Sequence, residues 1–483
     1  IAGGTFAMGA YNETVGVMNI SSGQVTGTGV LRASTYGFSN TSGTITIASV
    51  IAGDVGITKT GAGTLVLSGA NTYTGTTTIS GGKVVVTNNS GLGSTAAGTT
   101  VASGATLDLQ NVAVGAEQIT LAGGTLTDVT SSLAGDIILT ANSNLGATNV
   151  GDTLTLSGVI SGNYGITKIG AGTVVLSGAN TYTGATNINA GTLSVTGSLN
   201  DTTAVTVASG ATYSVGADDT IASVAGAGAV NLNSYTLTVG DANSTTYSGV
   251  MSGTGNLIKQ GAGTLTMSGA NTYTGDTTIN AGTLKLTGSL SSATDVVMAN
   301  AAVWDLQAAQ TVASLTMASG NSITNTAGTS SLTVSGTSTL ANSITTSGTQ
   351  TYTGAVSLAA DTTINTTNSA VTFSSATTGS AKVLTVNAGS GAINMAAIGV
   401  SGTPVGAVTL NSTGVTTLGG AIYAASVTTN AGGSVAINTT TITTSGAQTY
   451  NDAVTLGANA TFTTTDSAVT FVEAVTGSAK ALT

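Results

Sequence analysis

Few side chains in this sequence could take part in catalysis, and those few lie far apart. The chain has no histidine and no cysteine, and its single arginine is Arg32. A glycoside hydrolase needs two carboxyl groups about 5 to 9.5 Å apart, and the one adjacent acidic pair is Asp218–Asp219. Neighbouring strand residues point to opposite faces, so we expect a turn here, with a catalytic or calcium role as the alternative. We therefore predict no catalytic, cofactor-binding or metal-binding residue.

Three further acids have surroundings that could suit a calcium ion. Asp152, Asp241 and Asp276 stand beside glycine or asparagine in expected turns, and calcium takes carboxylate and carbonyl oxygens as ligands. The tandem glycine-rich nonapeptide of calcium-binding β-helices is absent. We expect these acids to form turns and predict no cofactor, while an occasional calcium ion stays open.

Lysine, asparagine and tyrosine recur at fixed spacing in three similar segments. The recurring residues are Lys59, Asn71 and Tyr73; Lys168, Asn180 and Tyr182; and Lys259, Asn271 and Tyr273. Recurrence within one chain indicates a structural role, so we expect the lysines to reach neighbouring carbonyls or cover a strand, with ligand contact as the alternative. The asparagines should turn the chain and bond the local backbone. The tyrosines, like Trp304, should pack inside rather than stack on sugars.

Threonine offers a different chemistry, because T-x-T spacing places two hydroxyls on one strand face. Such spacing occurs at Thr76–Thr78, Thr439–Thr441 and Thr463–Thr465. Stacked T-x-T faces are typical of ice-binding β-helices, but threonine is also a good exposed strand residue. The spacing is irregular here, so we expect ordinary exposed strands and keep ice binding as an alternative.

The composition excludes several classes of protein. Charged residues make up 5% of the chain and the net charge is −10, so the basic stripe needed to bind nucleic acid is absent. No run approaches 18 consecutive apolar residues, and we predict no membrane insertion in this fragment. Disordered chains are poor in apolar residues, whereas this one is 41% hydrophobic. The composition therefore predicts a packed, strand-rich fold.

Two long repeats organise the chain. The first, K-x-G-A-G-T-x-x-x-S-G-A-N-T-Y-T-G, begins at Lys59, Lys168 and Lys259. The second returns after 98 residues: Gly348 to Tyr352 matches Gly446 to Tyr450, and Ser369 to Phe373 matches Ser467 to Phe471. The last copy stops at Thr483 in the middle of its unit, so we expect the true chain to continue.

Short strands alternate with turns throughout both repeats. Thr64–Leu67 and Thr76–Ile79, for example, are each followed by serine, glycine or asparagine, which are turn residues. A β-sandwich array stays an alternative, but the chain has no evident linkers and few aromatic residues to fill sandwich cores. Aliphatic residues and threonine suit the thin core of a β-solenoid, and coils of roughly 20 residues would give about 24 of them. We predict an all-β protein, a continuous rod formed by a parallel β-solenoid.

The first repeat resembles the passenger-associated transport repeat of bacterial autotransporters. The 98-residue repeat is similar, more loosely, to repeats of giant filamentous-haemagglutinin-like surface proteins. The resemblance implies a right-handed parallel β-helix that is exported through the outer membrane of a Gram-negative bacterium by a type V route. It also implies a role of the repeat in folding and export, and display or release of the protein as an adhesin, fibre or scaffold.

We therefore expect a non-enzymatic extracellular protein, a rigid adhesin-like stalk or fibre at the bacterial surface. The alternatives are a self-assembling filament or sheath subunit, and a β-helical polysaccharide-active enzyme whose active part lies outside this fragment. Expected partners are other copies of the chain or cell and surface ligands, with polysaccharide contact open. The expected divisions are 1–58 (divergent coils), 59–290 (three copies of the first repeat), 291–347 (connecting coils) and 348–483 (98-residue repeats, truncated).

Overall fold

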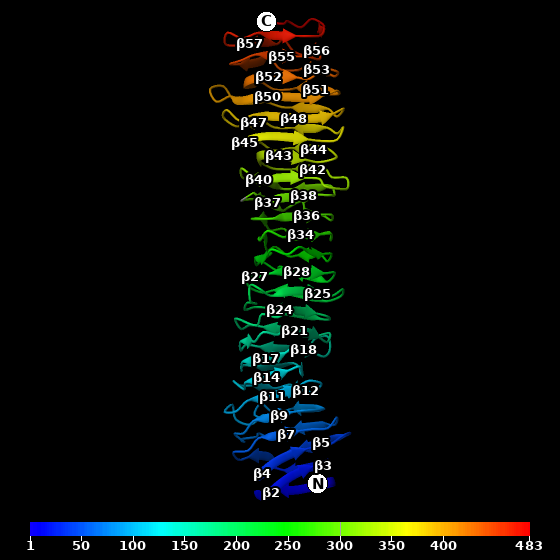
Figure 1. The fold of residues 1–483 in the computed structure, drawn as a ribbon, viewed down its shortest axis with the longest axis vertical. Coiled ribbons are helices and arrows are strands. Elements are labelled where there is room, and N and C mark those ends of the chain that lie inside the picture. The colour runs from blue at the N-terminus through cyan, green and yellow to red at the C-terminus, as the bar shows by residue number, and fades with distance from the viewer. Residues whose placement is uncertain (300) are drawn as a thin grey trace. The chain divides into compact units, whose positions relative to one another are not determined.

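The computed structural model describes residues 1–299 and 301–483, and every regular element within them is a β-strand. The chain forms two units, Ile1–Leu237 and Thr238–Thr483. In each unit the chain winds into coils, and the strands of one coil pair in parallel with those of the next (Figure 1). The two units together hold about 24 turns. The predicted all-β parallel solenoid is confirmed, and the sandwich alternative is wrong because sandwiches consist of antiparallel strands.

Three stacks of strands build unit 1. The first runs from β1 (Ala2–Gly9) through β8 (Thr64–Leu67), β10 (Lys83–Val86), β12 (Thr106–Gln110), β15 (Thr125–Val129), β18 (Ser143–Ala147), β21 (Ile166–Ile169) and β23 (Thr186–Ile188) to β28 (Ser223–Gly226). The second runs from β2 (Glu13–Ile20) through β7 (Ile57–Lys59) and β9 (Thr77–Ile79) to β20 (Ile160–Ser161). The third runs from β13 (Ala113–Val114) through β16 (Ser131–Leu133), β19 (Thr153–Leu156), β22 (Thr173–Leu176) and β24 (Thr192–Val195) to β29 (Ala229–Asn231).

Aliphatic side chains form columns through the interior of the coils. Leu65, Val84, Leu107, Leu126 and Leu145 follow one another in register on five successive strands, and all are fully buried. Each such side chain contributes about 1.5–3 kcal/mol by leaving water. Because successive residues of a strand point to opposite faces, the residues directly before and after each column residue point outward.

Unit 2 is also built from stacks of parallel strands, and two of its ladders run through many successive coils. One ladder runs through β34 (Thr264–Met267), β36 (Thr283–Leu286), β38 (Val303–Leu306), β41 (Ser322–Thr324), β43 (Ser338–Thr345), β45 (Val356–Asn365), β48 (Leu384–Gly389), β50 (Val405–Ser412) and β52 (Ile422–Thr429) to β55 (Gln448–Tyr450) and β58 (Val469–Phe471). Another runs from β39 (Gln310–Val312) through β42 (Leu332–Val334), β44 (Gln350–Tyr352) and β46 (Val371–Phe373) to β59 (Val475–Thr476).

The 98-residue repeat makes the same strand pair twice. Tyr352 on β44 pairs with Phe373 on β46, and their rings stack with centroids 4.9 Å apart. Tyr450 on β55 pairs with Phe471 on β58 in the same way, at 5.1 Å. The matching sequence segments thus adopt matching structures.

Tight turns explain much of the glycine content. In two turns after β7 and β9, Gly61 and Gly82 have φ angles of +71° and +66°, which glycine tolerates. A Cβ atom on Gly61 would lie 2.4 Å from the carbonyl oxygen of Asn40, in the coil before. The turns of successive coils can therefore touch because no side chain separates them.

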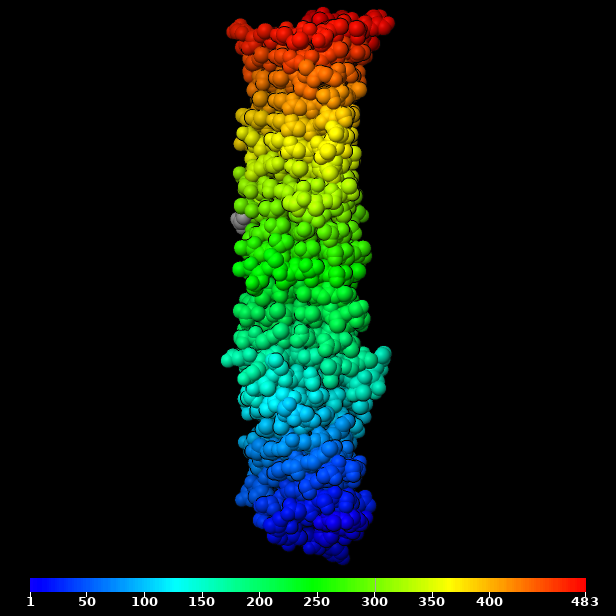
Figure 2. Space-filling view, turned by 45° about the vertical axis from the view of Figure 1, so that its right-hand side comes forward, coloured from blue at the N-terminus to red at the C-terminus, as the bar shows by residue number. Residues whose placement is uncertain are grey.

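The outer surface follows the order of the coils. Within each unit, the colours in Figure 2 succeed one another as bands, so each band of surface belongs to consecutive residues. In unit 2 the outward hydroxyls of Thr363, Thr385 and Thr409 stand in one register column. Among the described residues, no helix has the length and apolar character needed to cross a membrane.

Candidate functional site

The three recurring lysines lie inside the coils. Lys168 on β21 stands in an aliphatic column, in register between Leu145 and Ile188, and its residue is fully buried. Its Nζ donates to three backbone carbonyls, those of Ile169 at 2.9 Å, Gly170 at 2.8 Å and Ala190 at 3.0 Å. The first belongs to the end of β21, the second to the turn that follows, and the third to the next coil.

Lys59 and Lys259 make the same three contacts. Their Nζ atoms reach the carbonyls one, two and 22 residues further on. The expectation that these lysines reach neighbouring carbonyls is confirmed. Burial lowers the pKa of Lys59, and it lowers the pKa of Lys168 and of Lys259 to about 8. Because three carbonyl acceptors meet each ammonium group, it joins two turns that would otherwise leave oxygens unpaired.

The recurring asparagines connect coils as well as turning the chain. The Oδ1 atom of Asn180 accepts from the backbone N–H of Ile160 in the coil before, and its Nδ2 donates to Ser198 O in the coil after. It also bonds locally, to Gly178 O at 2.9 Å. Asn271 repeats this arrangement, and Asn71 makes the two bonds between coils. The predicted local bond is therefore confirmed for two of the three, and sequence reasoning missed the bonds between coils.

The recurring tyrosines are fully buried, as expected. The hydroxyl of Tyr73 lies 2.6 Å from Thr77 Oγ1, and the same pair recurs as Tyr182–Thr186 and Tyr273–Thr277. Burial raises the pKa of all three phenols. Trp304 is also fully buried, and its indole N–H has no partner within the described residues. The prediction that these aromatic residues pack inside is confirmed.

We call a corner each place where a buried polar side chain joins a turn to the next coil, as the three lysines do. A second kind of corner, formed by a glutamine, was missed by the sequence analysis. Gln350 on β44 stands in register between Leu332 and Val371 and is fully buried. Its Nε2 donates to Ile344 O, Thr346 Oγ1 and Asn365 O at 3.0–3.3 Å. Gln448 makes the matching contacts 98 residues later. The sequence did contain a signal for this buried amide: the glutamine of the repeated Gln-Thr-Tyr segment occupies a strand position that points inward.

The acidic pair does not converge on one point. Asp218 is exposed and accepts from Thr236 N, whereas Asp219 opens the strand β27 (Asp219–Ile221) and is buried. Both carboxylate oxygens of Asp219 accept from Leu199 N at 3.2 Å. Burial raises the pKa of Asp219 to about 6. Asp218 thus lies before the strand, whereas Asp219 belongs to it, because the strand starts one residue earlier than the Gly-Ala-Asp-Asp-Thr pattern indicates.

Two of the three acids considered for calcium bond within their own turns. Asp152 accepts from the backbone and side chain of Asn149, and Asp241 does the same for Asn243. Asp276 differs from these two, because it is its backbone N–H that takes part, donating to Asn256 Oδ1 in the coil before. Within the described residues no three His, Cys, Asp or Glu side chains gather closely enough to hold a metal ion.

The T-x-T segments differ in exposure. Thr76 is exposed and Thr78 is half-buried, with Thr77 buried between them, while Thr439 is itself buried. The regular hydroxyl column lies elsewhere, on β45, β48 and β50. Ice binding stays untested.

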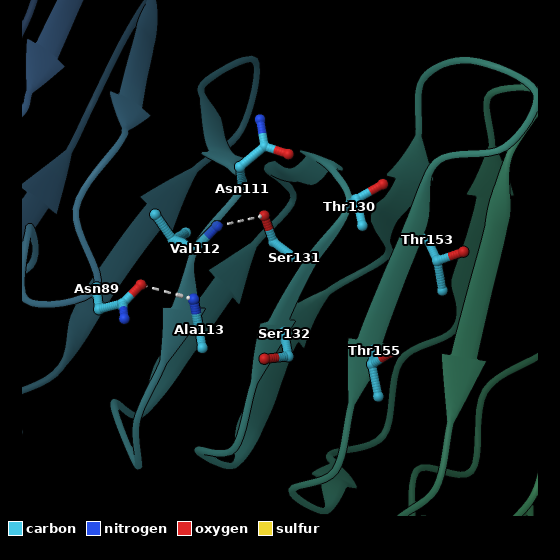
Figure 3. Close-up of a pocket in the computed structure, with 9 residues that line it drawn as sticks. All are labelled: Asn89, Asn111, Val112, Ala113, Thr130, Ser131, Ser132, Thr153 and Thr155. Carbon is cyan, nitrogen blue, oxygen red and sulfur yellow. Dashed lines mark hydrogen bonds between the residues drawn. The ribbon is translucent and has the colours of Figure 1, made fainter.

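A polar groove lies on the surface of unit 1 (Figure 3). It has a volume of about 620 Å³ and spans the first three strands of the third stack, β13, β16 and β19. Its lining consists of Asn89, Asn111, Val112, Ala113, Thr130, Ser131, Ser132, Thr153 and Thr155. The sequence analysis missed this groove, since its residues come from four separate stretches of the chain.

The segments around the buried lysines match a known family. The profile of the Passenger-associated-transport-repeat matches residues 57–86, 166–195 and 257–286. The chain carries passenger-associated transport repeats. Each transport repeat contains one lysine corner, one asparagine bridge and one tyrosine–threonine pair, so the features that identify the repeat are the polar groups buried inside the coils.

One curated relative supports the same assignment over a short stretch. The chain is 39% identical over 119 residues to a protein named Adhesin BmaC autotransporter from Brucella suis biovar 1 (strain 1330). This stretch is 24% of the chain and 3% of the relative. No solved structure matches the chain. The chain is thus an autotransporter-passenger-like β-solenoid with a distant adhesin relative, and this kinship implies export to the cell surface or beyond it.

Proposed function

We propose that the chain is part of the rigid, non-enzymatic stalk of an adhesin-like passenger, exported by a type V route and displayed on a Gram-negative bacterium. The observation that carries this proposal is the occurrence of three transport repeats within a parallel β-solenoid. The adhesin relative supports it over a short stretch.

A solenoid suits the task of a stalk because each coil contacts only its neighbours. Its length can grow by adding coils, and its stability is spread over many backbone ladders and aliphatic columns. In this account, residues 59–290 assist folding and export, residues 348–483 form a shaft of 98-residue repeats, and residues 1–58 and 291–347 are further coils. Partners are surface ligands or other copies of the chain.

Cryo-electron tomography of intact cells, combined with protease treatment of their surface, tests the proposal. We expect peptides of this chain among those released from intact cells, and thin rods attached at one end. Continuous fibres with regular contacts between subunits would support a self-assembling filament instead. Peptides released only after cell lysis would contradict surface display.

A further inference from the structure

The groove on unit 1 exists because the third stack of strands begins there. β13 is the first strand of that stack, and the preceding coil contributes a loop in place of a strand. The side chain of Asn89 in this loop covers the open edge, its Oδ1 accepting from Ala113 N at 2.9 Å. The groove is shallow and open to solvent, with a volume of about 620 Å³, so a ligand would lie along it rather than be enclosed.

Side chains in the groove have hydrogen-bonding groups that the fold does not use. In the described part of the chain, no side-chain hydrogen bond is made by Asn111, Thr130, Ser132, Thr153 or Thr155. Ala113, Ser132 and Thr155 stand in register, so hydroxyls repeat at the strand spacing of ~4.8 Å. Figure 3 shows Asn111 and Thr130 on the turns, with Ser132 and Thr155 on the strands beside them.

A column of outward amides in unit 2 shows the usual alternative. There Asn411 Nδ2 donates to Asn387 Oδ1 at 2.7 Å, and Asn387 Nδ2 donates to Asn365 Oδ1 at 2.8 Å. Those amides satisfy one another along the solenoid. In the groove, Asn89 and Ser131 accept from backbone N–H groups, but the five side chains named above do not bond to one another and remain available to a ligand.

Thr130 adds a second, independent observation. Its φ is +50°, a conformation that is strained for a β-branched residue. The turn of the neighbouring coil has Asn111 with φ +53°, and asparagine tolerates this region well. The fold alone would favour asparagine at both positions. Strain of this kind concentrates at functional sites, and Thr130 lines the groove.

The chemistry of the lining selects the class of ligand. None of the nine residues that line the groove is charged, so a phosphate, sulfate or carboxylate would find no counter-charge there. Hydroxyls and amides both donate and accept, as sugar hydroxyls do. We propose that the groove binds a neutral saccharide lying across the three coils. This inference deepens the proposed function, on which it rests, by naming a surface ligand for the stalk.

Binding of the purified full chain to a glycan array tests the inference. The array carries neutral, sialylated and sulfated oligosaccharides, and calorimetry with the best neutral oligosaccharide gives the affinity. We expect neutral oligosaccharides to bind, and Ser132→Ala and Thr155→Val each to weaken binding about tenfold, the effect of one lost hydrogen bond. Ser194→Ala is the matched control, because Ser194 stands in the same column two coils further on; it should bind as the wild type does.

Thr130→Asn separates a binding role from a structural one. We expect this variant to melt at a higher temperature, because the strain is relieved, and to bind the saccharide more weakly. A chain that binds no neutral oligosaccharide, or binds charged ones better, would overturn the inference, as would groove variants that bind like Ser194→Ala. The tomography of intact cells is unaffected by these results, so a displayed chain without saccharide binding would overturn this inference alone.

Discussion

In unit 1, the corner at Lys168 buries an ammonium group that donates to three backbone carbonyls. In unit 2, the corner at Gln350 buries a carboxamide that donates to two carbonyls and a hydroxyl. Both side chains interrupt an aliphatic column and bond to an adjacent turn and to the next coil. The transport repeat therefore closes a corner with a charge, and the 98-residue repeat closes one without it.

The two corners differ in what each side chain can offer. An ammonium group has donors only, whereas a carboxamide also has an acceptor. Tyr352 uses that acceptor, since its hydroxyl donates to Gln350 Oε1 at 2.8 Å, while Tyr182 in the transport repeat pairs with Thr186 instead. The charged corner should therefore not depend on its tyrosine, whereas the neutral corner should be coupled to its tyrosine.

The largest effect is expected from Lys168→Met. This change leaves three buried carbonyls without donors, and we expect a loss of about 3–5 kcal/mol in local stability. Hydrogen exchange of peptides that cover residues 166–192 measures it. Lys83→Met is the control, since Lys83 is 44% exposed in its pair with Asp108 and should cost less than about 1 kcal/mol. Equal losses of local stability in Lys168→Met and Lys83→Met would contradict the claim that the buried lysine stabilises the coils more than the exposed one does.

Gln350→Met should cost somewhat less, about 2–4 kcal/mol, because the lost donor is neutral and one of its acceptors is a hydroxyl. Hydrogen exchange of peptides around residues 344–365 reports the loss. Gln448→Met should behave in the same way, since Gln448 makes the matching contacts. Exposed Gln118 serves as the control. An unchanged exchange rate in both corner variants would mean that these amides do not hold the coils together.

The third prediction concerns pH. A change of pH should alter the stability of unit 1 but not the contribution of Gln350 to stability. Burial raises the pKa of Asp128, which is fully buried, to about 6 from 3.8. The folded chain therefore holds this proton more tightly than the unfolded chain, and stability rises as the pH falls through 6 towards 3.8. Asp128→Asn should stabilise the protein by about 1–2 kcal/mol at pH 7 and by little at pH 4.

Thermal melting of the wild type and of Asp128→Asn at the two pH values measures this difference. The corner at Gln350 contains no group that titrates in this range, so Gln350→Met should cost the same at pH 7 and at pH 4. A benefit of Asp128→Asn that does not change with pH would contradict the assigned cause.

The smallest effects are expected from removing single tyrosine hydroxyls. Tyr182→Phe and Tyr352→Phe should each cost about 1 kcal/mol. Double-mutant cycles distinguish the corners, because Tyr352→Phe and Gln350→Met should couple by at least about 0.5 kcal/mol, and Tyr182→Phe and Lys168→Met should add independently. Coupling of equal size in both cycles would show that the corners are organised alike.

The sequence was sufficient for the fold and for the structural role of the recurring lysines and tyrosines. Short strands, turn residues and aliphatic patterning predicted the parallel solenoid. The fixed recurrence of Lys59, Lys168 and Lys259 predicted a structural role, either contact with neighbouring carbonyls or covering of a strand. The bonds of Asn180 to two other coils could not be predicted, since they depend on the register between coils. The inward position of Asp219 depends in the same way on where a strand begins.

The groove of unit 1 could not be predicted from the sequence for a related reason. It results from the start of a third stack at β13, and nothing in the local sequence around Ala113 marks that event. The five polar residues whose side chains make no hydrogen bond become neighbours only when three coils are placed in register. The recurring glutamines Gln350 and Gln448 were overlooked because a neutral polar residue in a strand normally faces solvent.

The most direct test of this account is amine labelling of the native full-length protein, read residue by residue with mass spectrometry. The account predicts that Lys59, Lys168 and Lys259 stay unmodified, because their ammonium groups are buried against carbonyls, while Lys83 and the exposed Lys480 react. After unfolding, all five should react alike. Equal labelling of the three transport-repeat lysines and of Lys480 in the native protein would contradict the claim that these lysines close the corners of the solenoid.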